Sequence, residues 1–117
     1  MLLIYTTDNA ITEEERQHCY EESTALTHEL NSRGQFISAS PLQPVSTATT
    51  VRIREGKRQV TDGPFAETRE HLGGYFMIDA KDLNEAISIA SRIPAARFGT
   101  VEVRPVVELP NLPQVAE

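Results

Sequence analysis

The sequence contains a single cysteine, Cys19, among 117 residues, so no disulfide can form within the chain. It has no apolar run close to the roughly 18 residues that a membrane-spanning helix requires. The opening residues, MLLIYTTD, form an apolar run too short for a signal peptide, and they lack a basic leader. We therefore expect a cytoplasmic protein of one domain, stabilised by one hydrophobic core.

Several signatures of catalysis and cofactor binding are also missing. No serine lies in a nucleophile elbow, and Gly73-Gly74 lacks the spacing of a phosphate-binding loop. His18 and His28 are ten residues apart, which places them on different sides of a helix. No set of His, Cys and carboxylate residues has the spacing of metal ligands. We expect neither a metal nor a cofactor.

Positive charge is scarce in the first 31 residues, where Arg16 is accompanied by seven acidic side chains. The other 86 residues carry ten positive and ten negative groups. The cations cluster at Arg52, Arg54, Lys57 and Arg58, which is too few for the broad basic surface of a duplex-binding protein. Nucleic acid is therefore not an expected partner. The two arginines Arg52 and Arg54 either are solvated and paired with glutamates or bind an anion.

The hydrophobic pattern indicates an α+β domain over residues 1–108. Strands are predicted at residues 2–7, 36–40, 48–54, 58–61, 73–79 and 100–108, and helices at 12–32 and 82–93. Each helix begins with a capping signature, Thr12 with Glu15 and Asp82 with Glu85. Pro105 cannot donate to a ladder, so it marks an edge or a bulge in the last strand. Residues 109–117 read as a flexible tail.

The two predicted helices differ in their apolar faces. The first has a thin stripe, formed by Cys19, Leu26 and Leu30. Such a helix covers one surface and leaves its other sides in water. The second has a clear face, formed by Leu83, Ala86, Ile87, Ala90 and Ile93.

The order of the elements predicts a ferredoxin-like split β-α-β arrangement with a hairpin insertion. Two helices cover only one face of the resulting antiparallel sheet. The other face carries Val, Ile, Tyr and Phe side chains that need a cover. A second copy of the chain is the simplest cover, so we expect a homodimer with the sheets face to face.

The segment TDGPFAETRE, residues 61–70, is the strongest lead to function. Asp62, Gly63 and Pro64 have the chemistry of a tight turn, and Phe65 is expected to anchor the loop on the core. Asp62 is a candidate acid or base, provided that partial burial raises its pKa. The competing interpretation is a well-made connector with solvated charges.

Four further side chains are weaker candidates. His71 has a near-neutral intrinsic pKa and follows the loop, so it either acts as an acid or base beside Asp62 and Glu67 or lies on the surface at a strand entrance. Tyr5 and Tyr75 either bind a small ligand on the enclosed sheet face or pack in the core. Cys19 is interpreted as a packing residue.

The segment TDGPFAETRE followed by LGGYFMID resembles the signature of the DGPF-motif branch of the YCII-related family. MLLIY, ATTVRIR and RIPAARFGTVEVRP are also similar, so the resemblance covers residues 1–108. It implies a ferredoxin-like dimeric α/β barrel in which Asp62, Gly63, Pro64 and Phe65 match the motif. The branch has no established reaction, and its members often accompany extracytoplasmic-function sigma factors.

Other members of the family carry a His–Asp pair thought to form an active site. Neither His18 nor His28 lies in the Arg-Pro-x-x-His context of that branch, so the pair is not transferred to this chain.

Two hypotheses follow. The first is a small-molecule site at the dimeric barrel, where Asp62, helped by Glu67, His71 or Tyr75, carries out cofactor-independent acid–base chemistry of a lyase or isomerase type. The second is a non-enzymatic regulatory module that binds a ligand or a sigma-factor-type partner. The fold alone does not choose between them.

Overall fold

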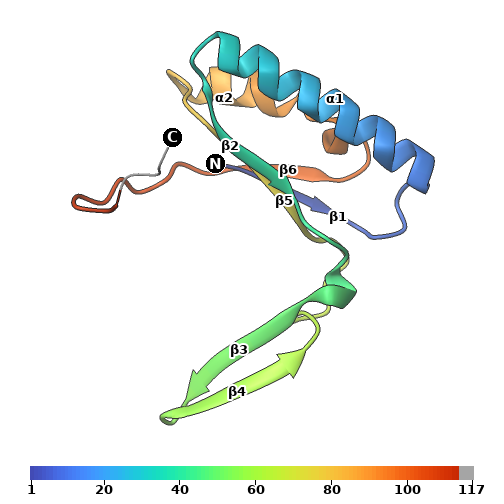
Figure 1. The fold of residues 1–117 in the computed structure, drawn as a ribbon, viewed down its shortest axis with the longest axis vertical. Helices are drawn as coiled ribbons and strands as arrows, with labels where there is room; N and C mark the ends of the chain where they lie inside the picture. Colours follow the sequence, from blue (N-terminus) through green and yellow to red (C-terminus); the bar gives the residue numbers. More distant parts are fainter. Residues whose placement is uncertain (114–117) are drawn as a thin grey trace.

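A four-stranded antiparallel sheet with two helices forms the body of the protein, and a hairpin extends from it (Figure 1). The structure is a computed structural model that describes residues 1–113. The elements in chain order are β1 (Leu2–Thr6), α1 (Glu13–Ser32), β2 (Phe36–Pro41), the 3-10 helix η1 (Val45–Thr47), β3 (Thr49–Arg54), β4 (Lys57–Asp62), β5 (His71–Ile78), α2 (Leu83–Ala90), the 3-10 helix η2 (Pro94–Arg97) and β6 (Thr100–Val103).

The sheet order is β2-β5-β1-β6, and each neighbouring pair is antiparallel. This order is compatible with a ferredoxin-like fold, in which two β-α-β units interlock. The β3–β4 hairpin is inserted between β2 and β5 as a separate two-stranded sheet. The predicted α+β class, with its two helices and antiparallel strands, is confirmed.

Both predicted helix starts are present. The Thr12 side chain accepts from the Glu15 N–H at 3.1 Å, and the Glu15 carboxylate accepts from the Thr12 N–H at 3.0 Å. Asp82 accepts in the same way from the Glu85 N–H at 2.8 Å. These bonds satisfy amides that the first helical turn leaves without intrahelical partners. Within residues 1–113, neither helix combines the length and the apolar character needed to cross a membrane.

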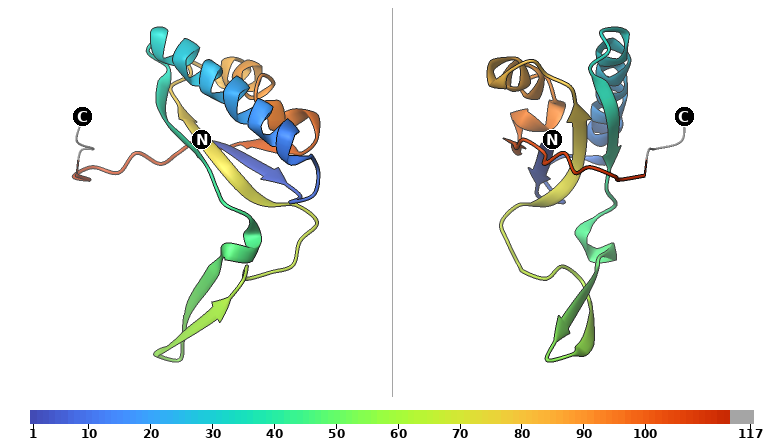
Figure 2. Two further views of the ribbon diagram at one scale, coloured as in Figure 1. Left: turned by 45° about the vertical axis from the view of Figure 1, so that its right-hand side comes forward. Right: turned by 90° about the vertical axis from the view of Figure 1, so that its left-hand side faces the viewer.

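The core lies between the sheet and the helices, which both cover the same face (Figure 2). Its buried apolar residues are Leu2, Leu26, Leu30, Phe76, Ile89, Ala90 and Ile93. Leu26 and Leu30 lie on the stripe predicted for α1.

The apolar face predicted for α2 is partly wrong. Leu83 is 61% exposed and Ile87 is also exposed, whereas Ile89 is buried. The residues at 86, 89, 90 and 93 follow the same three-and-four spacing as the predicted set, so two overlapping faces fit the sequence. Packing on the sheet selects the face that contains Ile89.

Two predicted boundaries differ from the structure by three residues or more. The last strand ends at Val103 and not at 108, because Pro105 follows without an N–H to donate to a ladder. The second helix ends at Ala90 and not at 93. Ile93 precedes Pro94 and adopts an extended backbone, since a proline disfavours helical geometry in the residue before it. Residues 114–117 of the predicted tail lie outside the described part of the chain.

Candidate functional site

A cavity of about 340 Å³ lies between α1 and the sheet. Its floor includes Ile4, Thr6 and Phe76, whose side chains point to the helix-covered face. Pro94 and Ala95 of η2 and the segment that connects β2 to η1 form its walls. Cavities that hold small organic molecules occupy roughly 300–1,000 Å³ and are mostly apolar with a few polar groups. The volume and the lining match that class of site.

The roof of the cavity explains why the apolar stripe of α1 is thin. Arg16, Cys19, Ser23 and Thr27 line the cavity at intervals of three or four residues, so they share one helix face. Farther along the same face, the helix reaches the core. Small and polar side chains between Arg16 and Thr27 fill less volume than leucines would, and they leave space above the sheet.

Two glycines keep the floor open. A Cβ atom on Gly74 would lie 2.9 Å from the carbonyl oxygen of Ser40, so β5 passes β2 more closely than a side chain permits. A Cβ atom on the neighbouring Gly73 would lie 3.2 Å from the Thr6 hydroxyl. Both glycines line the cavity.

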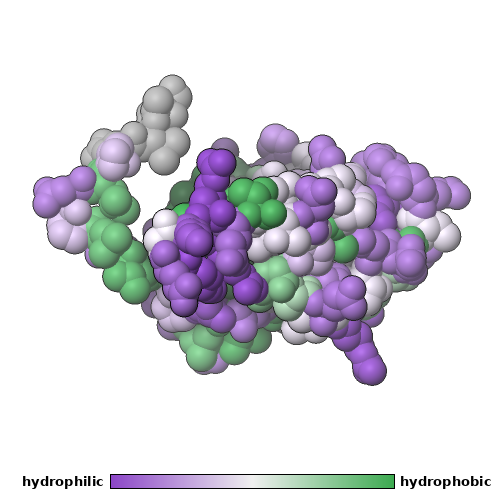
Figure 3. All heavy atoms as spheres, turned by 90° about the horizontal axis from the view of Figure 1, so that it is seen from below, coloured by the Kyte–Doolittle hydropathy of each residue, from purple (hydrophilic) through white to green (hydrophobic). Residues whose placement is uncertain are grey.

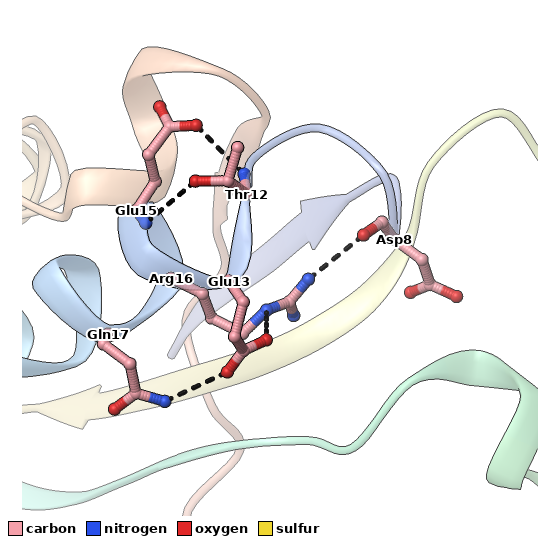
Figure 4. Close-up of polar contacts among 6 residues, drawn as sticks. All are labelled: Asp8, Thr12, Glu13, Glu15, Arg16 and Gln17. Atoms are coloured by element: carbon pink, nitrogen blue, oxygen red, sulfur yellow. Dashed lines mark hydrogen bonds and ion pairs between the residues drawn. The ribbon is translucent and has the colours of Figure 1, made fainter.

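Ionisable side chains are placed at the cavity. The Arg16 guanidinium donates to the Asp8 carbonyl oxygen at 3.1 Å and lies 3.5 Å from the Glu13 carboxylate (Figure 4). Its side chain is 28% exposed. His71 is the first residue of β5, pairs with Thr6 on the cavity side of the sheet, and places Nδ1 3.3 Å from the Thr68 hydroxyl. The cavity therefore combines a guanidinium cation with an imidazole ring.

Cys19 also lines the cavity, where it is half-buried. Burial raises the pKa of its thiol, and the positive charge of Arg97 opposes this effect only in part. A thiol with a raised pKa is protonated at neutral pH and is a poor nucleophile. This agrees with the interpretation of Cys19 as a packing residue.

The structure places the predicted site residues in three separate regions. His71 lies at the cavity. Tyr5 and Tyr75 pair with Leu72 and Leu3, so both point to the sheet face that the helices leave open. The DGPF turn lies at the base of the hairpin, outside the cavity lining.

The DGPF turn is fixed to the hairpin by its backbone. Gly63 has a φ of +94°, which glycine adopts without the steric cost of a Cβ atom. Its N–H donates to the Ala48 carbonyl at 2.7 Å, and its carbonyl accepts from the Thr50 hydroxyl at 2.8 Å. Pro64 is half-buried, while Asp62 and Glu67 are exposed.

The prediction that Phe65 anchors this loop on the core is wrong, because its side chain is 75% exposed. The hairpin extends away from the body and carries the turn beyond the reach of the core (Figure 2). Phe65 is instead an exposed aromatic at the base of the hairpin.

The cavity residues of α1 were missed as site residues. The available signal was the run of hydroxyl and small side chains at helical spacing, where a helix on a sheet normally carries large apolar residues. Within residues 1–113, no three or more His, Cys, Asp or Glu side chains form a group that could hold a metal ion.

Comparison with known proteins gives two matches. The family model described as YCII-related domain matches residues 1–110. An uncharacterised protein, R00369, from Rhizobium meliloti (strain 1021) is 34% identical over 110 residues, which cover 88% of this chain and 89% of the relative. The residues matched by the family model include those that line the cavity and those that form the hairpin and the DGPF turn.

Proposed function

The chain belongs to the YCII-related family, and we propose that it binds a small organic molecule in the cavity between α1 and the sheet. The observation that carries this proposal is the cavity itself, about 340 Å³ in volume, with an apolar floor and Arg16 and His71 in its lining. Arginine donates hydrogen bonds in a planar fork that matches a carboxylate. A small organic acid is the ligand class that this lining favours.

The chemistry that we propose is a cofactor-independent proton transfer of an isomerase or lyase type. In this proposal the His71 imidazole accepts a proton from the bound molecule and returns it to another atom of that molecule, as a general base and then a general acid. Asp62 ends β4, Glu67 lies in the loop between Asp62 and His71, and both side chains are exposed in the single chain. For Asp62 to serve as a second acid or base, a partner must cover its side chain and shield it from bulk water.

We further propose that the protein works as a cytoplasmic homodimer. The sheet face opposite the helices carries Tyr5 and Tyr75, together with Leu3, Leu72 and Met77. Packing two such faces would produce a dimeric α/β barrel and remove these apolar side chains from water. Tyr5 and Tyr75 would then lie in the enclosed space between the sheets.

A blocked cavity tests the binding proposal. A library of small organic acids is screened against the protein by ligand-detected NMR, and hits are remeasured with Ser23→Phe, which places an aromatic ring in the cavity. The control is Ala25→Phe, which adds the same ring on an exposed position of α1. We expect binding to be lost in Ser23→Phe and kept in Ala25→Phe. Equal binding by both variants would contradict the cavity assignment.

Solvent exchange tests the chemistry separately. A molecule that binds is incubated with the protein in D₂O, and deuterium incorporation is measured by mass spectrometry. We expect incorporation with the native chain and with Cys19→Ala, and a loss of at least tenfold with His71→Gln. If binding persists and no native sample incorporates deuterium, the protein binds without catalysing proton transfer.

The alternative function is a non-enzymatic module that acts with an extracytoplasmic-function sigma factor. The exposure of Asp62, outside the cavity lining, favours this alternative, because an aspartate of a catalytic pair is normally shielded from bulk water. Titration of a labelled sigma factor of this class with the protein, followed by fluorescence anisotropy, tests it. Saturable binding without deuterium incorporation would support the module over the enzyme.

A further inference from the structure

The loop that leads from the DGPF turn to β5 ends in a short chain of hydrogen bonds. The Thr68 hydroxyl donates to the Glu70 carbonyl oxygen at 2.5 Å and lies 3.3 Å from Nδ1 of His71. The Glu70 carboxylate accepts from the Thr100 hydroxyl of β6 at 2.8 Å. Because β1 lies between β5 and β6, this last bond spans the end of β1. The residues that enter β5 are thus tied to a strand that β5 does not pair with.

Solvation alone does not account for the contacts of Thr68. Its side chain is exposed, and hydrophilic residues cover much of the surface seen from the hairpin end (Figure 3). A hydroxyl at such a surface can bond to water instead of protein. What the two contacts of Thr68 do is hold the neighbouring His71 ring.

The direction of each hydrogen bond follows from the atoms involved. A carbonyl oxygen only accepts, and a hydroxyl has one hydrogen. The Thr68 hydroxyl therefore gives its hydrogen to the Glu70 carbonyl and has only lone pairs left for His71. Nδ1 of His71 must then donate an N–H to Thr68. In a neutral imidazole the other nitrogen, Nε2, keeps the lone pair.

This arrangement leaves one ring nitrogen free to act as a base. His71 lines the cavity, while its Nδ1 is bound to the loop. A molecule in the cavity can therefore transfer a proton to the ring only at Nε2.

We propose that Thr68 is a positioning residue for the proton transfer, which holds His71 with its proton on Nδ1 and leaves Nε2 as the base. This inference rests on the proposed function. When Nε2 takes a proton, the bond to that hydrogen in the bound molecule breaks, its electron pair stays on the molecule, and the ring becomes an imidazolium. Return of the proton from Nε2 to another atom of the same molecule restores the neutral ring. The proton on Nδ1 stays hydrogen-bonded to Thr68 throughout.

The end of the segment TDGPFAETRE then has a part in the chemistry that its turn does not. Asp62 is exposed and lies outside the cavity lining. Thr68 contacts the His71 ring directly, and Glu70 orients Thr68 through its backbone carbonyl. The bond from Thr100 to Glu70 supports this arrangement from β6.

The tautomer of His71 can be measured directly and without a ligand. In protein labelled with ¹⁵N at histidine, long-range ¹H–¹⁵N spectra of the neutral imidazole distinguish a protonated ring nitrogen from one with a lone pair. His71→Gln identifies the signals of His71. We expect the proton on Nδ1 in the native chain and in Thr68→Ser, and a larger share on Nε2 in Thr68→Val, which lacks the hydroxyl. Thr61→Val, on β4, is the control and should leave the ring unchanged.

Two results of this measurement would overturn the proposal. One is a native chain in which His71 carries its proton on Nε2, and the other is an unchanged ring in Thr68→Val. The native result needs no variant, so it decides the question even if a substitution unfolds the loop. The ring of His28, which is exposed on α1, is the internal reference.

The effect on the chemistry is measured with a molecule that binds in the cavity. Deuterium incorporation at low and at saturating concentration separates the rate constant of exchange from binding. We expect Thr68→Val to lower the rate constant about tenfold and to change binding by less than about twofold. Thr68→Ser should bring the rate constant to within about threefold of the native value. Equal rate constants in Thr68→Val and the native chain would contradict the positioning role.

These outcomes separate the role of Thr68 from the proposed function. A native chain that carries the proton on Nδ1 and incorporates no deuterium contradicts the proposed chemistry, and the role of Thr68 in it, while the cavity assignment stands. A native chain that incorporates deuterium with the His71 proton on Nε2 contradicts the positioning role alone.

Discussion

The Arg97 guanidinium donates two hydrogen bonds to the Glu22 carboxylate, at 2.9 and 3.1 Å, and so joins the middle of α1 to η2. Both elements line the cavity, with Ser23 on one side and Ala95 on the other. The bidentate geometry is the strongest form of this ion pair. It holds the roof of the cavity to one wall.

Removal of this ion pair is expected to weaken the fold in a pH-dependent way. The hydrogen bonds from Arg97 lower the pKa of Glu22 below its ordinary value. The pair therefore contributes stability above the pKa that Glu22 has in the unfolded chain, and this contribution is lost as the pH falls through the lower, folded-state pKa. Glu22→Gln should be slightly less stable than the native chain at pH 7, with a difference that shrinks in acid.

Urea unfolding at pH 7 and pH 3.5 measures this difference. Glu21→Gln is the matched control. The Glu21 carboxylate lies 4.0 Å from Nδ1 of His18 and does not form a bidentate pair with it. If the unfolding free energies of Glu22→Gln and the native chain differ by the same amount at pH 3.5 as at pH 7, the stabilising role of the Glu22–Arg97 ion pair is contradicted.

Neighbouring glycines on β5 should tolerate alanine differently. The new Cβ atom of Gly74→Ala would lie 2.9 Å from the backbone oxygen of Ser40. This contact is relieved only if the backbones of β2 and β5 move apart. The Cβ atom of Gly73→Ala meets a hydroxyl at 3.2 Å, which rotates away more easily. We expect Gly74→Ala to lose about 1–3 kcal/mol of unfolding free energy and Gly73→Ala less than about 1 kcal/mol. Equal losses in urea unfolding would show that the strand spacing is adjustable.

Truncation of two leucines distinguishes the core from the surface. Leu30 is fully buried, so Leu30→Ala should lose about 2–5 kcal/mol of unfolding free energy. Leu83→Ala should change it by less than about 0.5–1 kcal/mol, because the side chain is already exposed. Thermal and urea unfolding measure both. A large loss of unfolding free energy in Leu83→Ala would indicate that α2 packs on the sheet with the face that the sequence predicted.

The raised pKa of Cys19 predicts slow alkylation of the folded protein. Iodoacetamide reacts with the thiolate, so the midpoint of the rate against pH should lie higher in the folded protein than in the urea-unfolded chain. A ligand in the cavity should slow the reaction further, because Cys19 lines it. A folded-state midpoint at or below that of the unfolded chain would contradict the effect of burial.

Local sequence signals predicted most elements of the fold. Thr12 and Asp82 cap their helices through residues three positions away, and Pro105 prevents the last strand from continuing. Such signals act within a few residues and are legible without tertiary contacts. The face of α2 was not predictable, because the spacing of its apolar residues permits two faces and only packing on the sheet chooses Ile89.

The candidate site was less accessible to sequence reasoning. His71 was identified from its residue type and its place after the DGPF turn, and it lines the cavity. His71 and the two tyrosines lie on opposite faces of the sheet because of the register between β1 and β5, which shifts between Ile4 and Tyr5. No local sequence pattern predicts that register. The roles of Asp62, Glu67 and the two tyrosines stay predictions.

By itself, the sequence determined where the helices begin, the alternation of apolar and polar residues in β3 and the scarcity of large apolar residues on α1 before Leu26, because each depends on residues a few positions apart. Only the tertiary structure decided that the stretch of α1 from Arg16 to Thr27 roofs a cavity and that His71 and Tyr75 point to opposite faces of the sheet. Those relationships join residues far apart in the chain, and the packing of the sheet against the helices sets them.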